Sequence, residues 1–522
     1  MQPADSRDES VLAPPLPALS RPVLIGAVVA KILMHIPGLF RYGYFRDELY
    51  FLDCARHLDW GYVDCAPLVA VYAKIALALG GSLPALRILP MLAGAGMMAL
   101  TVLIARQLGG GAFAQALAGL AILIAPVHLM IDSVLSMNGF EPIFWMGCVL
   151  IMIRIIRGGD PRLWILFGFL AGLGLENKHS TLFFGAAVAV AVIATPLRRE
   201  LLRPWIWLGA AVALAIFLPN LIWQWQNGFP TVEDLQNVRA TGKNVALAPI
   251  PFLLQQTMIM HPANLPVWLA GLWFLFFGRG RSFRAVGWIY ISALVFFIVL
   301  HAKDYYLAPA YPMLLAAGGV TIEAWSTRIS GFRARTAARS AVAGWLIVSG
   351  AIFAPIALPL LSPADYVAYQ KKLGLAPQKT EVAHVGPLPQ LWGDQFGWPE
   401  LVGEVAEIYW ALPEKERLRT GIFASNYGEA GAINLFGPNH GIPPAISAHQ
   451  THSMWGPGEF VGDQLIWLQW SAESLERICC SVELVGEHRH PWGMAEENRP
   501  IYLCRELNPQ LSELWPQLQH WN

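Results

Sequence analysis

The sequence has little charge: 14% of its 522 residues are charged, whereas 55% are hydrophobic. Soluble domains carry about 25% charged residues, so this composition excludes an ordinary soluble protein. The formal net charge is zero, and no overall positive field favours a nucleic-acid partner. Apolar runs long enough to cross ~30 Å of hydrocarbon recur instead. The sequence therefore predicts an α-helical polytopic membrane protein.

Signatures of several other protein classes are also missing. The cysteines form no Cys-x-x-Cys motif, which argues against a zinc cluster. The Gly-Pro pairs at 437–438 and 456–457 mark turns, and no glycine-rich phosphate loop is present. No internal repeat typical of transporters is evident. Residues 1–21 lack a basic segment and a cleavage site, so they predict a disordered cytoplasmic leader.

The apolar segments predict about eleven membrane crossings. In order they are 24–40, 86–105, 113–130, 140–156, 163–175, 182–195, 205–223, 265–277, 286–300, 306–325 and 341–361. Segments 163–175 and 182–195 are short enough to form one span together. Two spans keep the arginine-rich turns on either side of the pair in one compartment. Segments 68–79 and 251–260 predict interfacial helices in the outer loops.

Charges of opposite sign occupy alternate turns. Arginines cluster at 154–162, 198–203, 279–284 and 328–339, whereas most acids lie in the opposite set of loops. By the positive-inside rule, the arginine-rich turns are cytoplasmic and the acidic loops lie outside.

After residue 361 the chain becomes more polar and rich in tryptophan. Residues 362–522 predict an outer α/β domain. Its expected helices are 399–412, 429–436 and 472–478, and its expected strands are 420–425, 464–470, 481–487 and 500–505. Disulfides are possible within the tail, among Cys479, Cys480 and Cys504, or within the first outer loop, between Cys54 and Cys65.

The first outer loop concentrates the acids with most chemical promise. Asp47 and Glu48 are adjacent, and Asp64 follows in the same loop. Helical neighbours point about 100° apart, so one acid can face a site while the other caps or pairs. The alternative is that Asp47 only stabilises the start of a helix over 48–58. Partial burial raises the pKa of a carboxyl group, which suits a general base.

Other candidates lie in the later outer loops. Lys178 and His179 occupy a tight turn so close to the bilayer that it must line a cavity or be buried in protein. Glu141 and Asn138 start a span, where the alternative is helix capping. Lys303 and Asp304 form either a site or a local pair. Tyr305 and Tyr306 also fit an interfacial aromatic belt.

Six stretches together resemble a known family. They are Asp47-Glu48-Leu49-Tyr50-Phe51, Gly61-Tyr62-Val63-Asp64 with Pro67-Leu68, Met137–Pro142, Gly172–Lys178, Pro219–Gln224 and Lys303–Pro312. Over about residues 22–325, the chain resembles the bacterial branch of the dolichyl-phosphate-mannose–protein mannosyltransferases. This is glycosyltransferase family 39 of the GT-C type, which includes the lipid A aminoarabinose transferases.

The resemblance implies a GT-C-like catalytic membrane domain over residues 22–361 and a periplasmic domain over 362–522. It implies residence in the bacterial inner membrane, with a cytoplasmic N-terminus. The expected activity is sugar transfer from a polyprenyl-phosphate donor to a lipid, glycan or protein acceptor, with inversion. Asp47 would be the base, with Glu48 beside it. A cation must stabilise the leaving phosphate; the candidates are Lys178, Lys303, Arg46, Arg56 and Arg239.

The chain also departs from its relatives. Cys65, Ala66 and Pro67 stand where the aminoarabinose branch has a lysine and other relatives have Gln-Pro-Pro. This makes aminoarabinose a less favoured donor sugar. His179 stands where relatives often have an aromatic or small residue. No cofactor is expected, although Asp64 and His261 are an alternative pair of ligands for a divalent cation.

Two other functions stay open at this stage. A transporter or flippase for a lipid-linked sugar would share the membrane region, and a non-catalytic assembly partner would share the outer domain. The outer position of the acids and the intact acid motifs favour an enzyme. The sequence does not name the donor sugar, the acceptor, any metal requirement or the oligomeric state.

Overall fold

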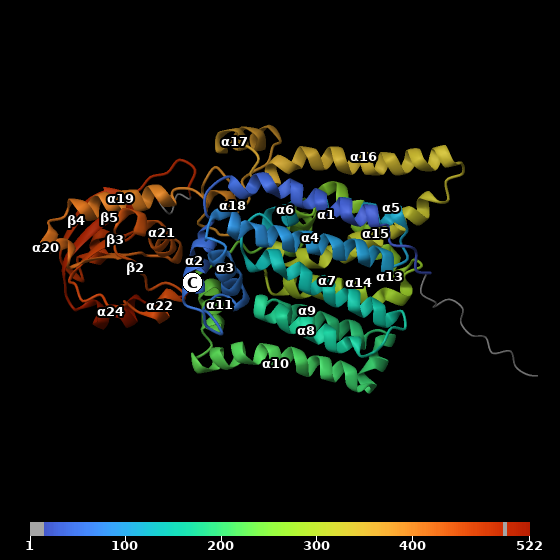
Figure 1. Ribbon diagram of the computed structural model, residues 1–522, viewed down its shortest axis with the longest axis horizontal. Coiled ribbons are helices and arrows are strands. Elements are labelled where there is room, and N and C mark those ends of the chain that lie inside the picture. The colour runs from blue at the N-terminus through green and yellow to red at the C-terminus, as the bar shows by residue number, and fades with distance from the viewer. Residues whose placement is uncertain (1–14, 494–497) are drawn as a thin grey trace, which may run out of the picture.

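A computed structural model describes residues 15–493 and 498–522. Helices running along the long axis make up most of the molecule, and a small α/β unit lies at one end (Figure 1). Residues 1–14, most of the predicted leader, lie outside the described residues. The proposed boundaries at residues 21 and 361 stay predictions.

Each predicted apolar segment coincides with one helix or with two consecutive helices. The helices are α1 (Arg21–His35), η2 (Ile36–Phe40), α2 (Arg46–Arg56), α3 (Leu68–Ala78), α4 (Leu83–Gln107), α5 (Ala112–Leu123), α6 (Pro126–Ile131), α7 (Met137–Ile156), α8 (Leu163–Asn177), α9 (Thr181–Ile193), η3 (Pro196–Leu202), α10 (Pro204–Gln226), α11 (Pro230–Thr241), α12 (Pro249–Ile259), η4 (Pro262–Asn264), α13 (Leu265–Phe276), η5 (Arg281–Phe283), α14 (Arg284–Val299), η6 (Asp304–Ala310), α15 (Tyr311–Ser326) and α16 (Phe332–Ala357). Predicted span 113–130 breaks at Ala125, which is extended because Pro126 follows it.

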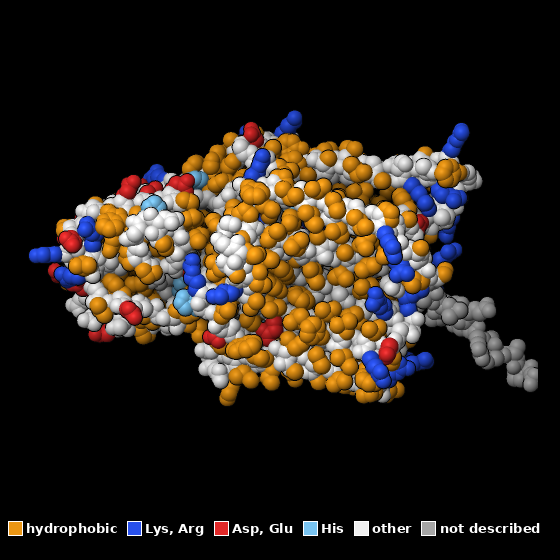
Figure 2. Space-filling view, viewed as in Figure 1, with side chains coloured by type: hydrophobic (Ala, Val, Ile, Leu, Met, Phe, Trp, Pro, Cys, Tyr) orange, Lys and Arg blue, Asp and Glu red, His pale blue; other side chains and the backbone are white. Residues whose placement is uncertain are grey.

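Six of the described helices are long and apolar enough to cross a membrane, or up to eight if two bent pairs count as single spans. These pairs bend by 102° between α9 and η3 and by 97° between α12 and the η4–α13 segment. The predicted count of about eleven therefore stays a prediction. Hydrophobic side chains cover the middle of the helical region, and Lys and Arg gather at its end farthest from the sheet (Figure 2).

The C-terminal part contains a mixed five-stranded sheet in the order β2-β1-β3-β5-β4. Its strands are β1 (Thr420–Phe423), β2 (Ala445–Ile446), β3 (Gln464–Leu468), β4 (Cys479–Glu487) and β5 (Pro500–Leu507). β1 is parallel to β2 and β3, whereas β5 is antiparallel to β3 and β4. The four predicted strands are confirmed. Sequence alternation missed β2, which is only 2 residues long.

Helices cover both faces of this sheet. The described helices of the C-terminal part are α17 (Pro363–Lys372), α18 (Gln390–Gly393), α19 (Trp398–Ala411), α20 (Glu414–Arg417), α21 (Tyr427–Phe436), η7 (Gly437–His440), α22 (His452–Trp455), α23 (Ala472–Leu475) and α24 (Leu511–Leu518). One core joins α19 and α21 to Ile422 and Ile466, and a second joins α24 to Phe423 and Trp467. The strands thus alternate their side chains between two apolar layers.

The structure distinguishes between the two disulfide regions that the sequence left open. A disulfide joins Cys479 of β4 to Cys504 of β5, and Cys480 beside it is free and exposed. Cys54 and Cys65 in the first outer loop are both buried and free. The pairing in the tail is therefore present in the structure, and the pairing in the loop is not.

Candidate active site

Glu48 fixes the start of α2 from the side that faces the membrane helices. One carboxylate oxygen accepts the backbone N–H of Phe45 at 2.8 Å, and the other accepts that of Leu135 at 2.8 Å. The guanidinium of Arg87 lies 3.4 Å away, and both side chains are buried. Arg87 also donates to the carbonyl groups of Gly38, Arg41 and Gly43, so it ties the preceding loop to α2. Glu48 is thus occupied by structural bonds.

Asp47 points the other way, toward the C-terminal part. Its Oδ1 accepts a hydrogen bond from the hydroxyl of Tyr427, on α21, at 2.9 Å. The side chain keeps 32% exposure. Burial raises the pKa of Asp47, while Arg46 and the bond from Tyr427 oppose that rise. Asp47 is therefore a partly exposed carboxylate with a raised pKa.

The close approach of α2 and α21 depends on small residues. A Cβ added to Gly431 would lie 2.6 Å from the backbone carbon of Leu49, and one added to Gly428 would lie 2.5 Å from the Arg46 side chain. Leu49 itself belongs to the core formed by α19, α21 and the sheet. This packing places Tyr427 beside Asp47.

Asp64 lies beside the same contact. Its Oδ1 accepts the hydroxyl of Tyr50 at 2.7 Å, and the Tyr50 oxygen lies 2.6 Å from Oγ1 of Thr451. The rings of Tyr50 and Tyr427 are 4.8 Å apart. Burial, reinforced by the charge of Asp234, raises the pKa of Asp64 to about 7. Two outer-loop acids with raised pKa values are thus connected through two tyrosines.

Lys178 is held at the turn between α8 and α9. Its ammonium donates to Asn138 at 2.8 Å and to Glu141 at 3.0 Å, and it lies 4.0 Å from the ring centre of Tyr306. Ser180 donates to the second oxygen of Glu141 at 2.5 Å. The structure therefore brings four predicted site residues together. His179 instead pairs with Asn220 at 3.1 Å.

Lys303 is a cation of a different kind. It precedes η6, and its ammonium has no hydrogen bond or ion pair among the residues that the structure describes. Its charge nevertheless opposes the rise that burial causes in the pKa of Asp47, and it helps to hold the pKa of Glu381 below its usual range. Asp304 beside it receives the backbone N–H of Tyr305 at 2.8 Å rather than pairing with Lys303. Of the two alternatives for this motif, the geometry does not support a local Lys303–Asp304 ion pair.

Arg46 is paired with three acids, one of which is Asp47, whose Oδ1 lies 4.0 Å from Nε of Arg46. Its guanidinium lies 3.3 Å from Glu381 and 3.7 Å from Asp394. Burial alone would raise the pKa of Glu381, but Arg46, Lys243 and Lys303 bring it down to about 2. Sequence reasoning missed Glu381, Lys243 and Tyr427. Their local sequences carry no recognisable motif, and their proximity to Asp47 comes from long-range packing.

Asp64 and His261, the alternative pair of metal ligands, contact different residues. His261 contacts the carbonyl of Ser349 at 3.2 Å and accepts the backbone N–H of Ala263 at 3.1 Å. Asp64 is bonded to Tyr50 instead. Residues 15–493 and 498–522 contain no group of three His, Cys, Asp or Glu side chains placed to hold a metal ion. The donor set therefore does not fit a metal centre built on this pair.

The arrangement of helices with a small C-terminal sheet is a GT-C-like fold. A profile of the dolichyl-phosphate-mannose-protein mannosyltransferase family matches residues 64–223. That match, together with the fold, confirms the resemblance that the six motifs indicated.

Solved structures share the fold. The chain resembles ArnT from Cupriavidus metallidurans in the apo state, with 15% identity and a TM-score of 0.58 over 93% of this chain and 99% of that one. It also resembles the same protein bound to undecaprenyl phosphate, with 15% identity and a TM-score of 0.57 over 94% and 98%. No curated protein sequence matches at a significant level.

Proposed function

We propose that the protein is an inner-membrane glycosyltransferase that transfers a sugar from a polyprenyl-phosphate donor to an acceptor on the periplasmic side. The single observation that carries this proposal is Asp47, a half-open carboxylate with a raised pKa, held by Tyr427 near the unpaired cation Lys303. The name of the matching family and the undecaprenyl phosphate in the second ArnT structure support a lipid-phosphate donor.

The chemistry follows from these groups. Asp47 takes the proton of the acceptor hydroxyl or amine as that atom attacks the anomeric carbon. The bond between that carbon and the phosphate oxygen breaks, and the phosphate leaves with the electron pair. A single displacement inverts the anomeric configuration. Lys303 and Lys178 stabilise the developing phosphate charge, because preorganised cations act strongly where charge appears in the transition state.

The neighbouring acids hold the machinery in place. Glu48 positions α2 through Arg87, and Glu141 with Asn138 positions the ammonium of Lys178. Asp64, His179, Asp304 and Tyr305 are proposed to contact substrate. The arginine-rich turns, which the positive-inside rule assigns to the cytoplasm, support the periplasmic location.

The test is transfer by the purified protein in liposomes that contain a radiolabelled polyprenyl-phosphate sugar. We expect Asp47→Asn to fold and insert normally and to reduce transfer by about 10²–10⁴-fold, the usual contribution of a general base. Asp160→Asn, which changes an exposed acid between α7 and α8, serves as the matched control and should transfer normally. Near-normal transfer by Asp47→Asn would show that another group is the base. Movement of the donor across the bilayer without transfer would favour a flippase instead.

A further inference from the structure

A cavity lies at the junction of the first outer loop, the end of α10 and α22. Its volume is about 370 Å³, within the range of small-molecule pockets. Trp223 and Trp455 supply aromatic walls, and Asp59, Gln226 and Asn227 supply polar groups. None of the residues named from sequence motifs as catalytic or substrate-binding lines it.

The walls of this cavity are held in fixed positions. The indole N–H of Trp223 donates to Asp59 at 2.8 Å, and the backbone carbonyl of Trp223 accepts a hydrogen bond from the side-chain amide of Asn227 at 2.9 Å. The Trp223 ring lies against the backbone of Gly61, where an added Cβ would come within 2.3 Å of a ring carbon. Trp455 stacks on His57 with ring centres 4.3 Å apart. The two indoles are therefore preorganised rather than free to rotate.

The chemistry of the walls fits a sugar ring. A pyranose presents apolar C–H faces that pack on indole rings and hydroxyl edges that need donors and acceptors. The side-chain amide of Gln226 has no hydrogen bond among the described residues, and Asp59 and Asn227 are exposed. Each oxygen of Asp59 already accepts one N–H, from Trp60 or from Trp223, and keeps a second lone pair. No lysine or arginine lines the cavity, so phosphate is not the favoured ligand.

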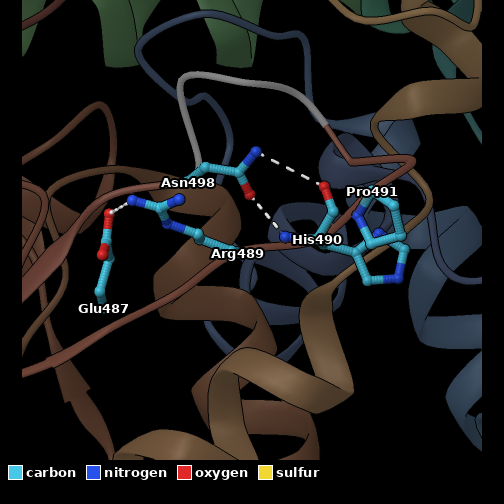
Figure 3. A pocket seen from close by; sticks show the side chains of 5 residues that line it. All are labelled: Glu487, Arg489, His490, Pro491 and Asn498. Atoms are coloured by element: carbon cyan, nitrogen blue, oxygen red, sulfur yellow. Dashed lines mark hydrogen bonds and ion pairs between the residues drawn. The ribbon is translucent and has the colours of Figure 1, made fainter.

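The hollow drawn in Figure 3 lacks this character. Its polar groups bond one another: Arg489 donates to Glu487 at 2.7 Å, and the backbone N–H of His490 donates to Asn498 at 2.7 Å. No tryptophan lines it, and no side chain in it offers an aromatic face comparable with the two indoles. The cavity beside α10 is therefore the better candidate for a ligand.

A short chain of contacts connects this cavity with the proposed site. Thr451 lines the cavity, and its Oγ1 lies 2.6 Å from the hydroxyl of Tyr50, which donates to Asp64. We infer that the cavity binds a neutral or amino sugar ring of the acceptor while a neighbouring acceptor group reaches Asp47. The inference that the cavity binds a sugar ring is drawn from the residues that line it. The inference that this sugar belongs to the acceptor rests on the proposed function.

The experiment measures saturation-transfer NMR of methyl glycosides of glucose, mannose and glucosamine with the full-length protein in nanodiscs. At least one glycoside should bind the unaltered protein, and Trp455→Ala should weaken that binding at least ~5-fold, the contribution of one stacking ring. Gln226→Ala, an exposed and structurally safe change, should weaken it less. Trp225→Ala is the matched control, because this indole is 69% exposed and does not line the cavity.

Three results would overturn the inference: no glycoside binds, Trp455→Ala and Gln226→Ala both bind like the unaltered protein, or inorganic phosphate displaces the bound glycoside. Asp47→Asn separates this inference from the proposed function, since it should lose transfer and keep glycoside binding. If the unaltered protein binds a glycoside but transfers no sugar from any tested donor, the proposed function fails and the cavity assignment survives.

Discussion

The two faces of α2 carry adjacent acids in opposite environments. On the face toward the membrane helices, Glu48 is buried against Arg87 and accepts two backbone N–H groups. On the face toward the C-terminal part, Asp47 keeps 32% exposure, receives one tyrosine hydroxyl and lies 4.0 Å from the guanidinium of Arg46. The comparison teaches that the hydrogen-bond and charge partners of a carboxyl group, rather than its residue type, decide whether it can serve a structural role or a reactive one. Glu48, buried with its arginine, holds the helix, whereas Asp47 has a more distant arginine and remains partly exposed, so it can take a proton.

The same contrast recurs among the cations. Lys178 is fixed by Glu141 and Asn138, whereas Lys303 has no ion pair among the described residues. The site therefore combines groups that are held with groups that are available. The following experiments test this division.

Glu48→Gln should have the largest effect on stability. It leaves the Arg87 guanidinium buried without its counter-charge, and breaking a buried pair in this way costs about 3–5 kcal/mol. We expect a clear loss of thermal stability in detergent. Asp47→Asn, one residue away, is the control and should change the unfolding free energy by less than about 1 kcal/mol, as surface changes usually do. Equal destabilisation by the two variants would erase the contrast between the faces of α2.

Lys178→Met should reduce transfer about 10²-fold, comparable with removal of one preorganised donor to a developing anion. It also leaves Glu141 without its cation, so the protein level must be matched before rates are compared. Lys178→Arg keeps the charge and should recover part of the rate. The measurement is transfer at saturating acceptor over a range of donor concentrations. If Lys178→Met transfers at the unaltered rate, this lysine only pairs with Glu141 and does not act on the phosphate.

Gly431→Val should separate the open face of α2 from α21. Its side chain would overlap the Leu49 backbone, and overpacking of this kind costs about 1–3 kcal/mol. We expect faster limited proteolysis and reduced transfer, because Tyr427 would move away from Asp47. Gly403→Val on α19 meets open space and is the matched control. Normal transfer by Gly431→Val would mean that the site does not need this contact.

Tyr427→Phe should have the smallest effect and a specific signature. The hydroxyl lowers the pKa of Asp47 by bonding its charged form, so its removal raises that pKa further. Because a base works when deprotonated, the acidic limb of the pH–rate profile should move to higher pH by about 0.4–1 unit, equivalent to one hydrogen bond. Tyr409→Phe, which loses only a bond to the carbonyl of Arg417, is the control. A shift to lower pH would contradict the assigned role of Asp47.

Much of the architecture follows from local sequence. Apolar length located the helices, and alternation located four strands of the sheet, because both patterns report which residues leave water. Proline explains the one predicted span that breaks, at Ala125. The two-residue strand β2 was not predicted, because so short a segment cannot show an alternation of apolar and polar residues.

The sequence by itself determined that this is a helical membrane protein with acids in its first outer loop and a distinct α/β tail, since composition and periodicity are local properties. The resemblance to the family also singled out Asp47 as the expected base, with Glu48 beside it. Only the tertiary structure decided between their environments: Glu48 meets Arg87 from α4, and Asp47 meets Tyr427 from 380 residues further along the chain. The physical reason is that water access and charge partners depend on which distant segments pack together, and packing of that kind leaves no periodic trace in the residues around Asp47.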